Sequence, residues 1–277
     1  QNGVYLTLSH LGEELINEKL PGIREISIKF ANVDPVKEPV PVVPTVHYMM
    51  GGIPTTLNGQ VRDGVKQKEV NGFYAVGECA CVSVHGANRL GSNSLLDLIV
   101  FGKAAGQHIL DSSKGKKLKK LPNDVTKKTI ERLKKIDTKS SLEDPRELGE
   151  ELRAVMQKHC GVFRFPQLLN EGLVKVHELK QRIGNISIKD NSKVFNTART
   201  EALELQNLIE VALATMASAK NREESRGAHS RSDFPKRDDN SWLQHSLYNP
   251  KDGSLAYRPV KMKPLSVKSF PLKERVY

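Results

Sequence analysis

Long apolar runs, aromatic residues and cysteines are all scarce in this chain of 277 residues. No stretch approaches the roughly 18 consecutive apolar residues that a membrane-spanning helix needs. Aromatic residues make up 5% of the chain. The three cysteines, Cys79, Cys81 and Cys160, are too few and too unevenly spaced for a disulfide framework or a zinc site. The sequence therefore argues against a membrane-spanning helix, a disulfide scaffold and a structural metal.

Two phosphate-binding motifs are also missing. No G-x-G-x-x-G occurs anywhere, so a dinucleotide-binding fold would need its pyrophosphate loop elsewhere. The segment Gly86–Gly91 looks like a phosphate loop, but Ser92 and Asn93 follow it where a Walker loop needs Lys and then Ser or Thr. The sequence thus excludes nucleoside triphosphate binding at this loop.

The start of the chain is unusual for a translation product. It begins at Gln1, and its first methionine is Met49. No positively charged segment followed by an apolar one marks a targeting peptide. We therefore expect a processed or partial chain.

Positive charge is in excess, since 43 Lys and Arg against 32 Asp and Glu give 43 − 32 = +11. Eleven of the basic residues lie between Lys114 and Lys139, a stretch without a single aromatic residue. Nucleic-acid surfaces combine such charge with aromatic side chains that stack on bases. We interpret this lysine-rich stretch as a solvated surface connector and expect no nucleic acid as a partner.

Local patterns predict the elements of the first half. An apolar pattern runs from Val4 to Leu20, and alternation over 23–31 predicts a strand. Four prolines (Pro35, Pro39, Pro41 and Pro44) then favour extended chain. Residues 74–76 read as a buried strand that ends in a turn at Gly77, and 94–110 read as a helix capped by Ser92 or Asn93.

The second half is predominantly helical. Apolar residues recur at helical spacing over 147–159, 168–183 and 197–220, which predicts a three-helix bundle. A polar tail with a short strand candidate at 255–260 follows. The predicted fold class is α/β + α, in which a Gly-rich, Rossmann-like piece precedes the bundle and a small mixed C-terminal domain.

The segment 72–106 carries the clearest chemistry. Glu78 ends a strand, where its carboxylate can accept hydrogen bonds from sugar or ribityl hydroxyls. The first amides of the following helix, those of Ser94 and Leu95, suit an anionic flavin edge. Arg89 offers a bidentate donor for a carboxylate. Spacing alone supports equally well the alternative, in which the segment is a Gly-rich structural turn with an exposed arginine.

Four co-linear blocks resemble the flavoprotein subunits of succinate dehydrogenases and fumarate reductases. They are the segment 72–106, His47-Tyr-Met-Met-Gly-Gly-Ile-Pro-Thr55, Met156-Gln to Gly161-Val-Phe-Arg164, and Glu224-Ser-Arg-Gly-Ala-His-Ser-Arg231 continued by Asp233-Phe-Pro and Arg237-Asp-Asp. Their order and spacing both match, so the resemblance covers essentially the whole chain.

The resemblance implies FAD as cofactor and the oxidation of succinate to fumarate. Electrons then pass to an iron–sulfur subunit and on to quinone at two membrane anchor subunits. By motif, His47 and Arg89 hold the substrate carboxylates, and Glu78, Ser94 and Leu95 contact FAD. His85 is interpreted as a hydrogen-bonded turn residue.

The family's N-terminal half does not match any part of this sequence. That half holds the pyrophosphate loop, the histidine that carries covalent flavin and the proton-transfer arginine. The resemblance therefore implies no catalytic residue here, and activity only beside the missing half of the subunit. It implies the end of a capping domain at 1–45, the returning piece of the FAD domain at 46–110, a helical domain with the lysine-rich connector at 111–222, and a C-terminal domain at 223–277.

Alternatives stay open on three points. The reaction can run as fumarate reduction: the Met49 and Leu95 motifs favour the dehydrogenase, which we prefer, whereas Gly77-Glu-Cys and Gly91-Ser-Asn resemble fumarate reductases. L-aspartate oxidase matches the His47 and C-terminal blocks less well. The helices and tail could instead form a non-catalytic module that docks the iron–sulfur subunit. The expected location is peripheral, on the cytoplasmic face of a bacterial inner membrane or, alternatively, on the matrix face of the mitochondrial inner membrane.

Overall fold

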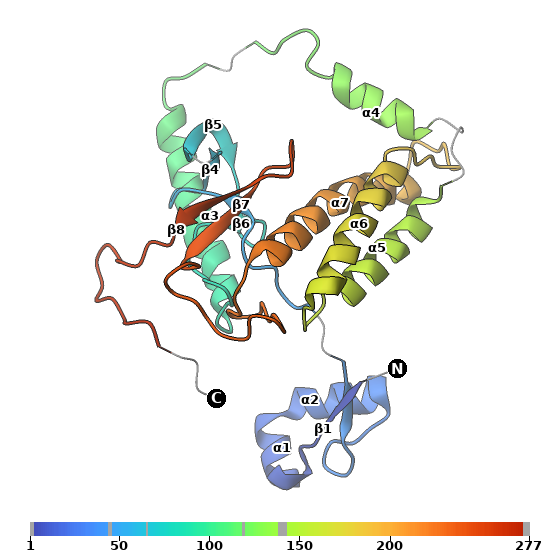
Figure 1. Ribbon diagram of the computed structural model, residues 1–277, viewed down its shortest axis with the longest axis vertical. Coiled ribbons are helices and arrows are strands. Elements are labelled where there is room, and N and C mark those ends of the chain that lie inside the picture. Colours follow the sequence, from blue (N-terminus) through green and yellow to red (C-terminus); the bar gives the residue numbers. More distant parts are fainter. Residues whose placement is uncertain (1–2, 44–45, 65, 118–119, 138–142, 274–277) are drawn as a thin grey trace. The chain divides into compact units, whose positions relative to one another are not determined.

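The computed structural model describes residues 3–43, 46–64, 66–117, 120–137 and 143–273 (Figure 1). The chain forms two compact units, Gln1–His47 and Tyr48–Tyr277, and each is treated by itself below. Among the described residues, no helix combines the length and the apolar character required to cross a membrane.

The first unit pairs strand β1 (Val4–Leu6) antiparallel with β2 (Val40–Val42). Between the strands lie η1 (Ser9–Leu11), α1 (Glu13–Lys19), α2 (Pro21–Ile26) and the π-helical η2 (Ser27–Ala31). The extended conformation predicted for the proline-rich connector is found at Val40–Val42, whereas Asp34 and Lys37 form a turn. The prediction at Pro44 lies outside the described residues.

The strand predicted over 23–31 is wrong, because this segment is helical. Pro21 occupies the first turn of α2, where its fixed φ suits a helix and its missing N–H costs nothing. Arg24 then donates to Asp34 at 2.8 Å and to Glu13 at 3.0 Å, which ties the helix to both of its flanks. These contacts outweigh the local alternation of apolar residues.

The second unit begins with two small sheets. β3 (Ile53–Pro54) pairs in parallel with β6 (Ala80–Cys81), and β4 (Gln60–Asp63) pairs antiparallel with β5 (Lys68–Tyr74). Of the strand predicted at 74–76, only Tyr74 belongs to a strand, because β5 ends there. The next amide, that of Ala75, donates to the Gly59 carbonyl outside the strand pairing. The predicted turn at Gly77 is confirmed, with φ of +83°.

Helix α3 (Asn93–Ser113) confirms the helix predicted over 94–110 and runs three residues further. Ser92 precedes it, but its left-handed backbone (φ +66°) places no side-chain cap on the helix. A hydrogen bond of 2.8 Å between the Tyr74 hydroxyl and His108 Nδ1 links the helix to the β4–β5 hairpin. Within the lysine-rich stretch, α4 (Lys127–Asp137) was not predicted, and positions 118–119 and 138–139 of that stretch lie outside the described residues.

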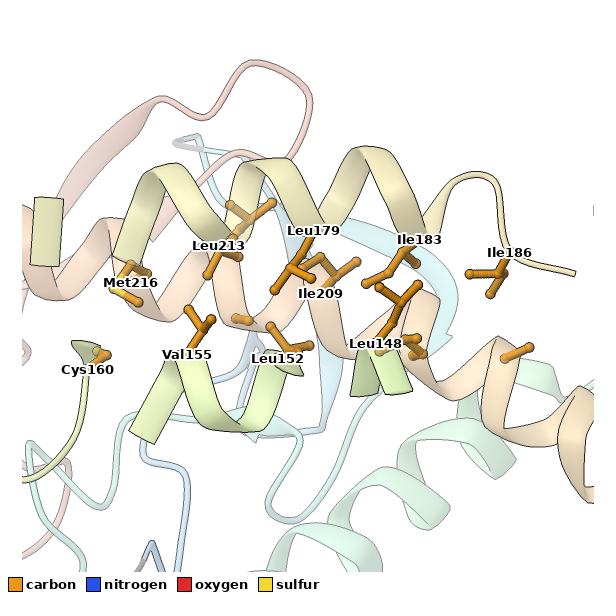
Figure 2. Close-up of a cluster of buried hydrophobic side chains, with 14 of the residues drawn as sticks. Leu148, Leu152, Val155, Cys160, Leu179, Ile183, Ile186, Ile209, Leu213 and Met216 are labelled. Carbon is orange, nitrogen blue, oxygen red and sulfur yellow. The ribbon is translucent and has the colours of Figure 1, made fainter. Parts of the chain in front are cut away.

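The predicted bundle is confirmed as α5 (Pro145–His159), α6 (Pro166–Ile183) and α7 (Thr197–Asn221), which lie side by side in Figure 1. Figure 2 shows their shared core, in which Leu152, Leu179 and Leu213 point toward one another. Gly172 allows α6 to approach the end of α5 closely, since a Cβ at Gly172 would lie 2.5 Å from His159 Cβ. The core is the apolar stripe that the 3.6-residue period predicts.

A turn-rich segment after α7 leads to the antiparallel hairpin of β7 (Gln244–Tyr248) and β8 (Leu255–Pro259), the second near the predicted strand. Arg231, which is 5% exposed, donates to the carbonyls of Ala219, Lys220 and Arg222 at the C-terminal end of α7. A cation there satisfies orphan carbonyls and complements the helix dipole. Arg231 thus fixes the segment against the bundle.

Candidate functional site

The predicted site residues fall in both units. Glu78, Arg89, Ser94 and Leu95 belong to Tyr48–Tyr277, whereas His47 is the last residue of the first unit and is exposed. The structure therefore defines the surroundings of the first four side chains. The pairing of His47 with Arg89 stays a prediction.

Glu78 lies in the turn after Gly77 and joins the two Gly-rich segments of the site. Its Oε1 accepts a hydrogen bond from the Met49 amide at 2.9 Å, while the side chain as a whole stays exposed. Nearby, the Ile53 amide donates to Cys79 at 2.9 Å. Gly52 has φ of +119°, and a Cβ there would lie 2.5 Å from the Cys79 carbonyl oxygen. Only glycine permits this approach, so the Gly51–Gly52 pair brings Met49 to Glu78.

Arg89 is a half-buried cation with unused hydrogen-bonding capacity. Its Cζ lies 4.3 Å from the centre of the Tyr48 ring, a cation–π contact. One terminal nitrogen makes a long contact of 3.5 Å with the Leu90 carbonyl. Its Nε is buried and has no hydrogen-bond partner among the described residues, nor does any described carboxylate pair with it. A guanidinium in this state suits an external anion.

Sequence reasoning missed Asp97, which is linked to Arg89 through His85 and the Tyr48 ring. Asp97, which is 6% exposed, shares a hydrogen bond of 3.1 Å with His85 Nε2. The His85 ring meets the Tyr48 ring edge-on, with centroids 5.7 Å apart. This agrees with the interpretation of His85 as a hydrogen-bonded turn residue. The available signal was an acidic residue within the apolar run Leu95–Val100 of a predicted helix.

The first turn of α3 meets the prediction only in part. The Leu95 amide donates to the Ser92 carbonyl at 3.2 Å, so it is not the free donor that was expected. The left-handed Ser92 tightens the turn and produces this bond. The Ser94 amide has no backbone partner among the described residues. The same end of α3 exposes Leu95 by 65% and Ile99 by 69%, an apolar surface next to these donors.

A small pocket borders the site between the segment 80–86, Gly51 and His245. His245 Nε2 and Ser83 Oγ share a hydrogen bond of 3.2 Å, and Arg258 also donates to Ser83 Oγ. Burial and the nearby Arg258 charge lower the pKa of His245. The described residues hold no cluster of three His, Cys, Asp or Glu side chains that could bind a metal ion, and the three cysteines are free thiols.

Comparison with known proteins matches both ends of the chain to families. Residues 149–277 match "Fumarate reductase flavoprotein C-term", and residues 1–95 match "FAD binding domain". The succinate dehydrogenase flavoprotein subunit of Coxiella burnetii is 51% identical over 277 residues, which cover 98% of this chain and 47% of that protein. The mitochondrial succinate dehydrogenase [ubiquinone] flavoprotein subunit of Oryza sativa subsp. japonica is 45% identical and covers 99% of this chain and 45% of that protein.

Solved structures agree with the sequence matches. The E. coli quinol fumarate reductase FrdA superposes with a TM-score of 0.82 at 37% identity, over 97% of this chain and 46% of that chain. The Mycobacterium smegmatis Sdh1 structure superposes with a TM-score of 0.78 at 29% identity, over 95% of this chain and 44% of that chain. This chain thus spans about half the length of the relatives it matches. The four motifs, the matched domains and the shared fold establish that the chain belongs to the succinate dehydrogenase and fumarate reductase flavoprotein family.

Proposed function

We propose that this chain is the C-terminal part of a succinate dehydrogenase flavoprotein subunit, which oxidises succinate to fumarate with FAD. The observation that carries the proposal is Arg89, a half-buried guanidinium that has no carboxylate partner among the described residues and lies on Tyr48. Among the curated relatives, the 51% identity to a succinate dehydrogenase subunit, against 40% to the Mycobacterium tuberculosis fumarate reductase subunit, supports the oxidative direction.

The described residues fit FAD. Glu78 keeps an exposed carboxylate for hydroxyl groups, and the Ser94 amide is available at the start of α3. The exposed Leu95 and Ile99 side chains offer an apolar surface for a planar ring. The amide of Leu95 is already bonded, so we propose that Leu95 contacts FAD through its side chain. When bound, FAD supplies the hydride acceptor for succinate.

A dicarboxylate has two charged ends, and each needs its own donor. We propose that Arg89 binds one carboxylate through paired N–H bonds and that His47 binds the other. Clamping both ends fixes the central C–H bond relative to the hydride acceptor, and such orientation accounts for much of enzymatic rate enhancement. Tyr48 holds the Arg89 guanidinium through its ring face, and the His85–Asp97 pair supports Tyr48 from the side.

Activity belongs, in this proposal, to the complete subunit. The sequence contains neither a G-x-G-x-x-G loop nor the family's proton-transfer arginine, so the remaining half of the subunit must supply both. We propose residues 1–45 as the end of the capping domain, 46–110 as the returning piece of the FAD domain, 111–222 as the helical domain and 223–277 as the C-terminal domain. The chain alone is then inactive.

The proposed partners are the rest of the flavoprotein subunit, an iron–sulfur subunit and two membrane anchor subunits. The proposed location is peripheral, on the cytoplasmic face of a bacterial inner membrane. The higher identity to the Coxiella burnetii protein than to the rice mitochondrial protein supports this location over the mitochondrial matrix face.

The test replaces Arg89 by Lys in the complete subunit that contains this chain. Lysine keeps the charge but lacks the planar pair of donors, so we expect turnover to be abolished and dicarboxylate binding to weaken by at least about 30-fold, consistent with about 2–5 kcal/mol for a lost charge partner. Arg146→Lys, on the exposed surface of α5, is the matched control and keeps wild-type kinetics. Near-normal kcat for Arg89→Lys would refute the assignment.

The second variant, His47→Ala, separates substrate from cofactor binding. We expect it to weaken dicarboxylate binding while flavin absorbance stays at the wild-type level. Loss of flavin instead would make His47 a cofactor or structural residue. A complete subunit that purifies without flavin absorbance would favour the non-catalytic docking module.

A further inference from the structure

The C-terminal segment of this chain lies directly on the loop that carries Arg89. Gly227 has φ of +59°, and a Cβ at this position would lie 2.4 Å from the Ala87 carbonyl oxygen and 2.6 Å from its carbonyl carbon. The Ala228 amide also points at that oxygen, at 3.4 Å. Ala87 is two residues from Arg89, so the backbone at Gly227 and Ala228 limits where the Arg89 loop can lie.

We propose that Gly227 is a positioning residue for Arg89: the missing side chain lets the C-terminal turn support the Ala87 carbonyl and thereby places the guanidinium that binds substrate. The inference rests on the proposed role of Arg89 in dicarboxylate binding. It adds a residue from a different part of the chain, 138 positions after Arg89, to the determinants of that site.

The turn around Gly227 is too well fixed to yield. The Arg226 amide donates to the His229 carbonyl at 2.8 Å, and the His229 amide donates back to the Arg226 carbonyl at 3.0 Å, which closes the turn from both sides. Beneath it, Arg226 binds both oxygens of Glu224, which is fully buried. Arg231 anchors the same segment to the end of α7. A side chain at Gly227 would therefore displace the loop rather than the turn.

The Arg89 loop, by contrast, has few fixed points of its own. Gly86 and Gly91 flank it, and a Cβ at either position would meet open space. Arg89 itself is held by the Tyr48 ring face and one long contact to its neighbour Leu90. Relief of the 2.4 Å contact requires a shift of several tenths of an ångström at Ala87. Misplacement of about 1 Å at a substrate-positioning group can cost about 100-fold in rate.

The experiment compares Gly227→Ala with Gly253→Ala in the complete subunit. Gly253 is the matched control, because it has a similar φ of +71° in the β7–β8 turn but nothing within 4 Å of its Cβ position. Both substitutions carry the same left-handed backbone strain. Only Gly227→Ala adds contact with Ala87.

Binding of malonate, a dicarboxylate without the adjacent carbons needed for dehydrogenation, is measured through the change that it causes in flavin absorbance. We expect Gly227→Ala to weaken malonate binding at least tenfold, with flavin content and melting temperature equal to those of Gly253→Ala. The KM for succinate rises in parallel. Malonate binding by Gly227→Ala as tight as that of Gly253→Ala would overturn the proposal.

A second pair of variants guards against misfolding. Gly227→Asn adds a Cβ as Gly227→Ala does, but with less backbone strain, since Asn tolerates left-handed φ better than Ala does. Gly253→Asn is its control. Failure of both Gly227 variants to fold, while both Gly253 variants fold, would also overturn the proposal, because Gly227 would then support the whole domain rather than the Arg89 loop.

Arg89→Lys separates this inference from the proposed function. Loss of malonate binding by Arg89→Lys together with full binding by Gly227→Ala would refute only the role of Gly227. Full malonate binding by Arg89→Lys would refute the proposed function and, with it, the positioning role.

Discussion

Arg164 donates a hydrogen bond of 2.5 Å to Nδ1 of His229, and this contact assigns the tautomer of the histidine. A guanidinium cannot accept a hydrogen bond, so Nδ1 must carry the lone pair. The proton then lies on Nε2, which donates to the Arg222 carbonyl at 3.2 Å. Burial, reinforced by the Arg164 charge, lowers the pKa of His229 to about 4. The neutral ring thereby links α7, the segment after α5 and the turn that holds Gly227.

His229 makes stability depend on pH. Its pKa is about 4 when folded, against an ordinary value of 6.5, so the unfolded chain binds the extra proton first. Stability from this residue is complete above pH 6.5 and is lost as pH falls towards 4. We expect His229→Gln, which keeps an acceptor and a donor, to flatten the decline seen in denaturant titrations between these pH values. An identical decline in both proteins would contradict this prediction.

Glu224 is the buried centre of the ion pairs in the C-terminal segment. Burial alone would raise its pKa, but Arg226, the Asp238 amide and Arg222 together hold the pKa below its ordinary value. Glu224→Gln removes the charge that balances the two arginines, and unpairing buried charges costs about 3 kcal/mol. Urea unfolding measures this loss. Glu143→Gln, which breaks a more exposed pair with Arg182, serves as the control and should shift the urea midpoint far less.

The bundle core can be tested within one helix. Leu213 of α7 is 1% exposed and lies in the core shown in Figure 2, whereas Leu208 on the same helix is 51% exposed. Leu213→Ala should destabilise the chain by about 3 kcal/mol through lost burial and the cavity left behind. Leu208→Ala should change stability by less than about 0.5 kcal/mol. Equal losses in the two variants would show that the core is not where the structure places it.

Tyr48 can be tested as the support of the Arg89 guanidinium. A cation–π contact at a partly exposed site contributes about 0.5–2 kcal/mol. Tyr48→Leu should therefore weaken malonate binding to the complete subunit by about 2- to 30-fold. Tyr48→Phe keeps the ring face and should bind like the wild type. Weakening of both variants to the same degree would assign the effect to the hydroxyl instead.

Periodicity and motif order determined most of the architecture. The helices α5, α6 and α7 follow from apolar spacing, because a helix that buries one face must repeat its apolar residues every 3.6 positions. The same spacing predicted most of α3, although Leu95 and Ile99 of that helix are exposed. Family membership follows from four motifs in fixed order, which the comparisons confirm. These properties are local or co-linear, so a single sequence can carry them.

Long-range contacts decided the rest. Alternation predicted a strand over 23–31, but Arg24 binds Asp34 and Glu13 and the segment is helical. The bond from the Leu95 amide to the Ser92 carbonyl is local, but apolar spacing could not show it because it depends on the left-handed backbone of Ser92. Nor could that spacing show that the buried Asp97 holds His85. The close approach of Gly227 to Ala87 joins residues 140 positions apart, and only the folded chain brings two such backbone segments into contact.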